Sequence, residues 1–244
     1  MARILLVHGS CHGAWCWRDL IPELTALGHD AFAIDLPSHG TDTTPMAEVT
    51  LDLYAQAILD ALDGPTIVVG HSMAGYPISR AADLRPANIA RLVYLCAYVP
   101  WDDHSLVEMR LRAPRQPILK ALEKSADGQS FSVIPEHARE VFYHDCPDEA
   151  VAFALANLCP QPIRPQATKV TLGANYESVP RSYIRCEADS AIPPEFQATM
   201  AADFSPDQVR HMPTSHSPFF AAPAALARHI DTLARHDPPG PPAS

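Results

Sequence analysis

Residues 68–75, Val-Val-Gly-His-Ser-Met-Ala-Gly, place a serine between a short apolar run and a helical pattern. A serine at such a strand-to-helix corner lies on a sharp turn, with its hydroxyl exposed above the sheet. The turn requires small neighbours, because the strand and helix backbones nearly touch. Gly70, Ala74 and Gly75 supply them, although Ala74 stands where a glycine is usual. The pattern predicts that Ser72 is a nucleophile.

Short apolar runs alternate with longer helical patterns along much of the chain. The expected strands are Arg3–His8, Ala31–Asp35, Thr66–Gly70, Arg91–Ala97, Ser182–Glu187 and Gln208–Met212. The expected helices lie near Trp17–Leu27, Leu51–Leu62, Met73–Leu84, Pro194–Phe204 and Ala222–His236. This alternation is typical of an α/β fold with a mostly parallel sheet covered by helices on both faces.

The alternation stops between residues 101 and 180, a segment rich in proline with helix-like stretches and no convincing core strand. We expect a core formed by 1–100 and 181–236 and a helical cap formed by 101–180 over the active site. A peripheral helical decoration without a role in binding is the alternative. The proline-rich tail at 237–244 cannot continue a helix and is expected to be disordered.

Composition narrows the class of partner. The chain has 244 residues, 47% of them hydrophobic and 19% charged, and a formal net charge of −10. This charge argues against nucleic acid or an anionic membrane as the main partner. No apolar run approaches the roughly 20 residues of a membrane span. The apolar run at 4–7 is too short for a signal peptide, so a cytoplasmic location is expected.

Cofactor and metal motifs are not evident in the sequence. The six cysteines are scattered without zinc-type spacing, which suits reduced thiols in a cytoplasmic protein. The first expected strand is not followed by a G-x-G-x-x-G pattern, and there is no P-loop. The sequence therefore predicts chemistry that needs neither a metal nor a cofactor.

A serine hydroxyl becomes nucleophilic only when a base accepts its proton, so a histidine is required. In enzymes with such an elbow, the acid and then the histidine follow the serine on loops after later strands. His216 fits best, in the loop 213–217 between the last strand and the last helix. His211 competes, but it falls inside the expected strand.

The acid orients the histidine and stabilises its charged form. Asp189 follows the strand Ser182–Glu187 within two residues and is the preferred candidate. Glu187 lies at the end of the strand, and Asp102 and Asp103 follow the preceding strand, a position that some hydrolases use.

The oxyanion of an acyl-transfer intermediate needs two backbone N–H donors. The N–H of Met73, directly after the nucleophile, is the first. The second is expected from the loop 8–13, His-Gly-Ser-Cys-His-Gly, whose glycines permit a tight backbone. Cys11 is the preferred donor there, and Ser10 is the alternative.

With these residues in place, the chain resembles the α/β-hydrolase superfamily over essentially its whole length. The closest likeness is to the group of plant hydroxynitrile lyases, plant methyl esterases and their bacterial esterase relatives. The matching segments are LLVHGSCHGAWCW, LGHDAFAIDLPSHG, VVGHSMAG and AIPPEFQ. The resemblance implies a six-stranded parallel sheet and a mobile helical cap, supports Asp189 as the acid, and is compatible with a homodimer.

The same resemblance separates two chemistries. Hydroxynitrile lyases of this group carry a lysine directly after the catalytic histidine and a threonine after the histidine of the first strand. These positions are Ser217 and Gly9 here. Cyanide expulsion would therefore lack its cationic partner, whereas ester hydrolysis needs none, so we expect an esterase.

The expected substrate is a small to medium ester, largely apolar, with aromatic esters included. The residues expected to contact it are Gly9, Ser10, Trp15, Trp101, Phe142 and Ser217. A thioesterase, lactonase, amidase or carbon–carbon bond hydrolase are alternatives among enzymes. A small-ligand receptor with vestigial hydrolysis is the alternative outside them.

Overall fold

The computed structural model describes residues 1–235, so the tail expected at 237–244 lies outside the described residues. Its main sheet has six strands in the order β2-β1-β3-β4-β8-β9, and every neighbouring pair is parallel. The strands are β1 Arg3–Val7, β2 Asp30–Ile34, β3 Thr66–His71, β4 Ile89–Leu95, β8 Arg181–Cys186 and β9 Val209–Met212. The predicted α/β fold with six parallel strands is confirmed.

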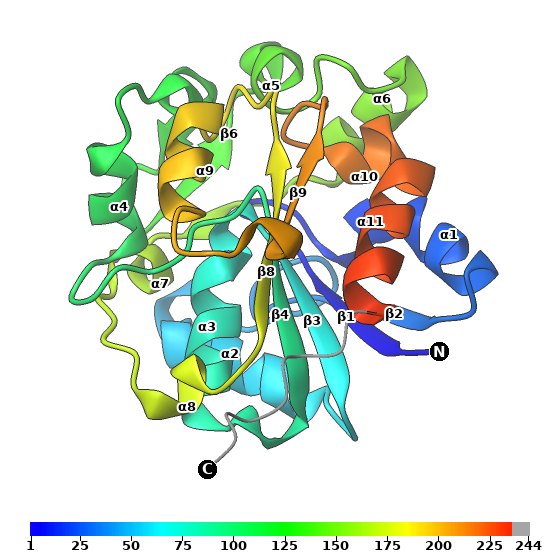
Figure 1. The fold of residues 1–244 in the computed structure, drawn as a ribbon. Helices are drawn as coiled ribbons and strands as arrows, with labels where there is room; N and C mark the ends of the chain where they lie inside the picture. The colour runs from blue at the N-terminus through cyan, green and yellow to red at the C-terminus, as the bar shows by residue number, and fades with distance from the viewer. Residues whose placement is uncertain (236–244) are drawn as a thin grey trace.

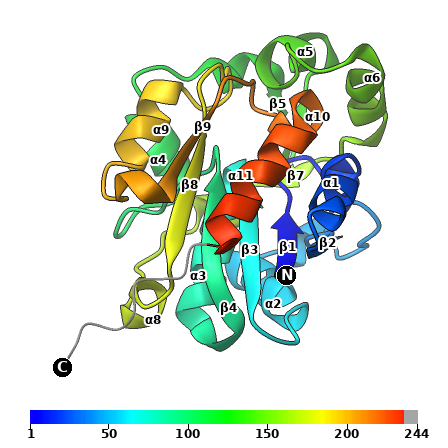
Figure 2. The ribbon, with the colours of Figure 1, turned by 45° about the vertical axis from the view of Figure 1, so that its right-hand side comes forward.

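Helices cover both faces of this sheet (Figures 1 and 2). One face packs against α2 (Leu51–Asp60), α3 (Gly75–Leu84) and α9 (Pro194–Met200), and the other against α1 (Leu20–Ala26) and α11 (Pro223–Arg235). Successive residues of one strand therefore pack alternately into two separate cores, one on each face of the sheet. Because both faces of the sheet are buried, its strands can consist of continuous apolar runs, and this explains the apolar runs seen in the sequence.

The strand β1 shows this division residue by residue. Ile4 and Leu6 belong to the core beneath α1 and α11, whereas Leu5 and Val7 belong to the core beneath α2 and α3. All four side chains are fully buried. This alternation follows from the two-residue period of a strand and leaves the carboxyl ends of the strands as the place where polar side chains gather.

Two predicted helices differ in their bounds from the structure more than the others do. The pattern at 17–27 begins with a 3-10 turn, and α1 starts only at Leu20. The pattern at 194–204 ends as a helix at Met200, where turns lead to Ser205 and Pro206.

Residues 101–180 contain five short helices and also a small antiparallel sheet that the sequence analysis missed. The helices are α4 Leu106–Arg112, α5 Pro135–Phe142, α6 Asp148–Asn157, α7 Arg164–Ala167 and α8 Ala174–Glu177. The strands are β5 Leu122–Lys124, β6 Ser130–Val133 and β7 Gln161–Pro162, in the order β5-β6-β7. In Figure 1, α5 and α6 lie beyond the ends toward which the arrows of the main sheet point.

The remaining helical elements are short. They are α10 Pro218–Ala221 and the 3-10 turns Ala14–Trp17, Met46–Glu48, Ser72–Ala74, Pro86–Asn88, Pro117–Ala121 and Pro206–Gln208. None of the helices within residues 1–235 combines the length and the apolar character needed to cross a membrane.

Candidate active site

Ser72 lies at the junction of β3 and the turn that leads into α3, with φ of 55°. This left-handed backbone is costly for a non-glycine residue and is typical of functional turns. A Cβ atom on Gly70 would lie 3.1 Å from the backbone of Ala74, and one on Gly75 would overlap the carbonyl oxygen of Tyr98. Ala74 itself is fully buried in its place. A glycine is therefore required at position 75, where the helix meets the loop after β4, whereas position 74 accommodates a methyl group.

The loops after β8 and β9 bring an aspartate and a histidine together. His216 donates from Nδ1 to Oδ2 of Asp189 at 2.7 Å, and both side chains are almost completely buried. The backbone N–H groups of Ala191 and Ile192 donate to Oδ1 of Asp189 at 2.7 and 2.9 Å. Gln197 donates from Nε2 to Oδ2 at 2.8 Å. Four donors thus fix the carboxylate, and Nε2 of His216 is left for the serine.

The alternative base and acid are occupied elsewhere. His211 and Glu187 contact each other, with 2.6 Å between Nδ1 and Oε1, on the exposed edge of the sheet. Asp103 pairs with Lys169 at 3.2 Å on the surface. Asp102, its neighbour, is also exposed. The structure brings Asp189 and His216 together and leaves these four side chains outside the site.

The N–H of Cys11 does not point into the space above Ser72. It donates to Oε1 of Gln161 at 3.4 Å, so its direction is set by that side chain. This contact disfavours Cys11, the preferred candidate from the sequence, as the second oxyanion donor. The N–H of Met73 belongs to the first turn of a helical segment, where N–H groups have no intrahelical partner.

The carbonyl oxygen of the peptide between Gly9 and Ser10 accepts two hydrogen bonds. Nδ1 of His8 donates to this oxygen at 2.9 Å, and the N–H of His12 donates to it at 3.3 Å. In a trans peptide the N–H points opposite to the carbonyl. The N–H of Ser10 is therefore directed away from both histidines, and Ser10 lines the same cavity as Ser72. The geometry favours Ser10, the alternative donor.

Three buried histidines around this loop are neutral. Burial lowers the pKa of His8 and of His71 well below the usual value, and it lowers that of His12 to about 4. Their hydrogen bonds agree with the neutral form: His8 donates from Nδ1 and accepts the N–H of Leu36 at Nε2. His12 donates from Nδ1 to the carbonyl of Ser10 at 2.7 Å.

Acid should destabilise the fold through these histidines. In the unfolded chain a histidine takes up a proton near pH 6.5, whereas folded His12 does so only near pH 4. The unfolded state therefore binds more protons in this window, and stability falls as the pH drops through it, by about 3 kcal/mol from His12. Replacing His12 with asparagine, whose amide can still donate to the Ser10 carbonyl, should flatten the dependence. The free energy of unfolding, measured with urea between pH 7 and 4, tests this prediction. The same dependence of that free energy on pH in both proteins would contradict it.

His71, Cys96 and His216 place one potential metal-ligand atom each within 4.8 Å of one another, among residues 1–235. Nε2 of His71 donates to the carbonyl of His216 at 2.8 Å, and Sγ of Cys96 lies 3.6 Å from the same oxygen. Nδ1 of His216 is engaged by Asp189. Burial also raises the pKa of the Cys96 thiol well above its usual value, which disfavours the thiolate that a metal needs. These contacts hold the His216 loop against the elbow.

Ser72 and His216 line a common cavity of about 20 Å³ beneath residues 101–180. Five apolar side chains from that segment close it: Ile118, Leu122, Phe131, Val133 and Phe142. Phe142 was expected there, and the other four were missed. Asp127-Gly128, between β5 and β6, is a strong hairpin signal that could have located three of them. The cavity holds about one water molecule, so an ester can enter only if these side chains move.

Gly9 and Ser217 lie close to the catalytic residues. A Cβ atom on Gly9 would be 2.7 Å from Nδ1 of His71 and 3.0 Å from Cβ of Ser72, so the elbow leaves no room for a side chain. Ser217 is fully buried, and its hydroxyl has no hydrogen-bond partner within residues 1–235. Neither residue is among those that line the small cavity.

The two tryptophans that were expected to contact substrate also lie outside this cavity. The ring of Trp15 stacks on His12, with 5.3 Å between the ring centres, and contacts Phe153 at 5.6 Å. Trp101 packs against Phe196 at 5.9 Å. Their positions are explained by aromatic packing beside the site.

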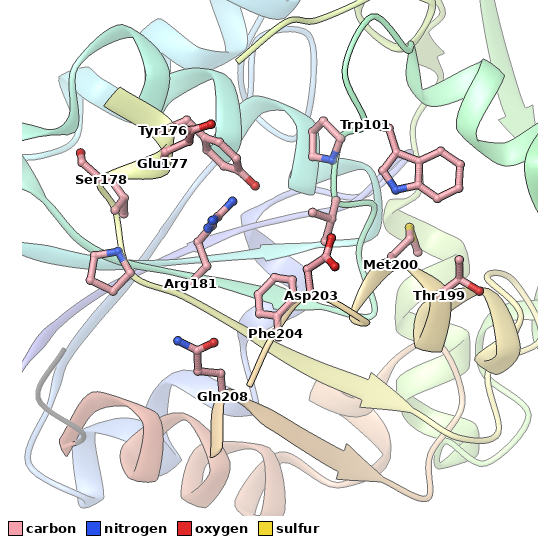
Figure 3. Close-up of a pocket in the computed structure, with 14 residues that line it drawn as sticks. Trp101, Tyr176, Glu177, Ser178, Arg181, Thr199, Met200, Asp203, Phe204 and Gln208 are labelled. Carbon is pink, nitrogen blue, oxygen red and sulfur yellow. The ribbon is translucent and has the colours of Figure 1, made fainter. Parts of the chain in front are cut away.

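Trp101 lines a larger cavity of about 440 Å³, between α8, α9 and the start of β8 (Figure 3). Arg181 points toward Tyr176 there, with its guanidinium 4.5 Å from the ring centre. Asp203 projects between these residues and Met200. No histidine is among the lining residues. The larger cavity therefore lacks the histidine that a serine nucleophile needs, whereas the smaller cavity has one in His216.

Comparisons with known proteins concern the whole chain and its fold. Residues 4–229 match the model of the alpha/beta hydrolase family. Methylesterase 1 of Arabidopsis thaliana is 31% identical over 249 residues, covering 94% of this chain and 95% of the relative. A pyrethroid hydrolase from Sphingobium faniae has a TM-score of 0.86 at 27% identity, covering 96% and 97% of the two chains. An Arabidopsis methylesterase structure has a TM-score of 0.83 at 25% identity, covering 96% and 99%.

Proposed function

The chain belongs to the alpha/beta hydrolase family, within the group that contains the plant methylesterases, and we propose that it hydrolyses carboxylic esters through an acyl-enzyme on Ser72. The observation that carries the proposal is the buried pair of His216 and Asp189 beside the strained serine. A histidine fixed in this way can accept a proton at Nε2 from a serine hydroxyl.

In the first half of the reaction, Oγ of Ser72 attacks the ester carbonyl carbon while its proton passes to Nε2 of His216. The carbonyl oxygen becomes an oxyanion that the N–H groups of Met73 and Ser10 stabilise. The intermediate then collapses, the bond to the alkoxy oxygen breaks, and His216 returns the proton to that oxygen. An alcohol leaves, and the acyl group remains on Ser72.

In the second half, water attacks the acyl carbon and gives a proton to His216. The same two N–H groups stabilise the second oxyanion. His216 then protonates Oγ of Ser72 as the carboxylic acid departs. Asp189 stays ionised throughout, because its role is to hold Nδ1–H of the imidazole and to stabilise the positive charge.

The cavity lining supports a neutral, largely apolar substrate of small to medium size. The five side chains from residues 101–180 are aliphatic or aromatic, and no lysine, arginine, aspartate or glutamate lines the cavity. An aromatic acyl group suits the rings of Phe131 and Phe142. The names of the relatives point the same way, since they include methylesterases and a pyrethroid hydrolase.

Two positions favour ester hydrolysis over cyanohydrin cleavage. Ser217 follows His216, so no cation is provided there for a leaving cyanide. A side chain at Gly9 would collide with Ser72 and His71, so that position cannot carry a threonine hydroxyl in this backbone.

A series of esters tests the proposal. We expect turnover of methyl and p-nitrophenyl esters with neutral acyl groups, and slower turnover when the acyl group carries a carboxylate or an ammonium group. Tight binding of such esters without release of acid or alcohol would instead indicate a receptor and would contradict the proposal.

A further inference from the structure

Gln161 connects the segment above the active site to the loop that supplies the second oxyanion donor. We infer that Gln161 is a positioning residue for the oxyanion hole, acting through the backbone of Cys11 and Ser10. The inference rests on the proposed ester hydrolysis. Gln161 belongs to β7, is fully buried, and is not among the residues that line the catalytic cavity. It therefore acts on the loop and not on the substrate.

All the hydrogen-bonding capacity of the Gln161 amide is used. Its Oε1 accepts from the N–H of Cys11 at 3.4 Å and from Nε2 of His39 at 3.0 Å. Its Nε2 donates to the hydroxyl of Tyr54 at 3.1 Å and to the carbonyl of Pro162 at 3.0 Å. The Cys11 N–H can only donate and the Pro162 carbonyl can only accept, so the amide has one orientation. The contacts of Nε2 with Tyr54 and Pro162 thus fix Oε1 in the position where it accepts from the loop.

The loop from Gly9 to His12 is held peptide by peptide. The peptide between Ser10 and Cys11 has its carbonyl bound by Nδ1 of His12 and its N–H bound by Gln161. The next carbonyl, of Cys11, accepts from the N–H of Cys159 at 3.0 Å. Cys11 has φ of 63°, so the loop turns through a left-handed residue that needs such support. Residues 159 and 161 supply two of these contacts from outside the loop.

The consequence of losing the Gln161 acceptor follows from these contacts. The N–H of Cys11 would be buried without a partner, which is costly enough to rotate its peptide. That peptide is joined to Ser10 at one Cα atom, so rotation misdirects the Ser10 N–H. A displacement of about 1 Å in a catalytic group can cost as much as a 100-fold loss of rate. The apolar cavity would be unchanged, so the loss should fall on kcat rather than on KM.

The test compares Gln161→Leu and Gln161→Glu with an exposed control, Gln129→Leu, in the full chain. Steady-state kinetics on a neutral p-nitrophenyl ester are combined with inhibition by two ketones that differ only in fluorination of one methyl group. A trifluoromethyl ketone forms a hemiketal with Ser72 and places an oxyanion in the hole, whereas the methyl ketone only occupies the cavity. Labelling of Ser72 by a fluorophosphonate in the wild type reports separately on the proposed function.

For Gln161→Leu we expect kcat to fall about 10- to 100-fold with KM nearly unchanged. The affinity for the trifluoromethyl ketone should fall in parallel, and that for the methyl ketone should stay constant. Gln161→Glu should recover most of the rate, because its carboxyl group in the protonated form accepts from Cys11 and donates to the Pro162 carbonyl. Gln161→Met, which also removes the acceptor and leaves no room for water, carries the same expectation if the leucine variant does not fold. An unchanged kcat beside an active wild type, or equal weakening of both ketones, would overturn the inference.

Discussion

Replacing Ser72 with alanine should lower the rate of ester hydrolysis by about 10⁴- to 10⁶-fold. The substitution removes the only atom that forms the acyl bond, while Asp189, His216 and the oxyanion donors stay in place. Residual turnover would come from water activated by His216. The backbone at position 72 has φ of 55° for either residue, so alanine adds no strain. Initial rates on a neutral p-nitrophenyl ester, together with thermal unfolding, measure both effects.

The control for this variant is Ser178→Ala, which alters an exposed serine on the wall of the larger cavity. It should retain the wild-type rate. If Ser178→Ala lost activity and Ser72→Ala kept it, the assignment of the catalytic cavity would be wrong. A large drop in the melting temperature of Ser72→Ala would show that the rate loss reflects unfolding rather than chemistry.

Asp189→Asn is expected to reduce kcat by about 10⁴-fold although it hardly changes the shape of the side chain. The amide oxygen should keep the Oδ1 position, because the N–H groups of Ala191 and Ile192 donate there. The amide NH₂ would then face His216. It would also face Nε2 of Gln197, which is a donor as well. Gln197 cannot turn its oxygen toward the new NH₂ group, since that oxygen accepts the N–H of Cys186 at 3.0 Å. His216 would be driven to the tautomer with its proton on Nε2, where it can no longer accept from Ser72.

Asp145→Asn is a matched control for the aspartate. Asp145 accepts the N–H of Ser215 at 2.8 Å, next to the catalytic histidine, and an asparagine oxygen can do the same. This variant should stay within a few-fold of the wild-type rate. Activity of Asp189→Asn within tenfold of the wild type would contradict the role given to the acid.

The gathering of Ser72, Asp189 and His216 at one place could be predicted from the sequence, because each residue follows a strand in a fixed chain order. Ser72 is marked by the small residues around it, and Asp189 by its place just after the strand at 182–187. These are local signals. The parallel sheet was predictable for the same reason, since its strands are continuous apolar runs between helical patterns.

Some of the contacts that segment 101–180 makes near the site could not be found in this way. Gln161 lies 150 positions from Cys11 in the sequence, and nothing in its local pattern indicates that contact. The geometry favours Ser10 over Cys11, and this could not be read from the sequence because the direction of an N–H depends on which carbonyls are held nearby. Trp15 and Trp101 are large and apolar, but such side chains serve packing as readily as binding.

Gln197 is an intermediate case. It is the last residue of the segment AIPPEFQ, which carried part of the family resemblance, yet no role was assigned to it. Its contacts with Asp189 and Cys186 show that it fixes the carboxylate from the helix α9. A polar side chain one turn into a helix, just after the expected acid, is a signal that could have identified it.

Covalent trapping tests the central claim most directly. A fluorophosphonate should add once to the wild-type protein by forming a bond between phosphorus and Oγ of Ser72, with loss of fluoride and of the hydroxyl proton. Intact mass and peptide mapping should show one adduct at Ser72, none in Ser72→Ala, and loss of ester hydrolysis in proportion to labelling. An adduct on another residue, or full hydrolysis by a protein labelled at Ser72, would contradict the account.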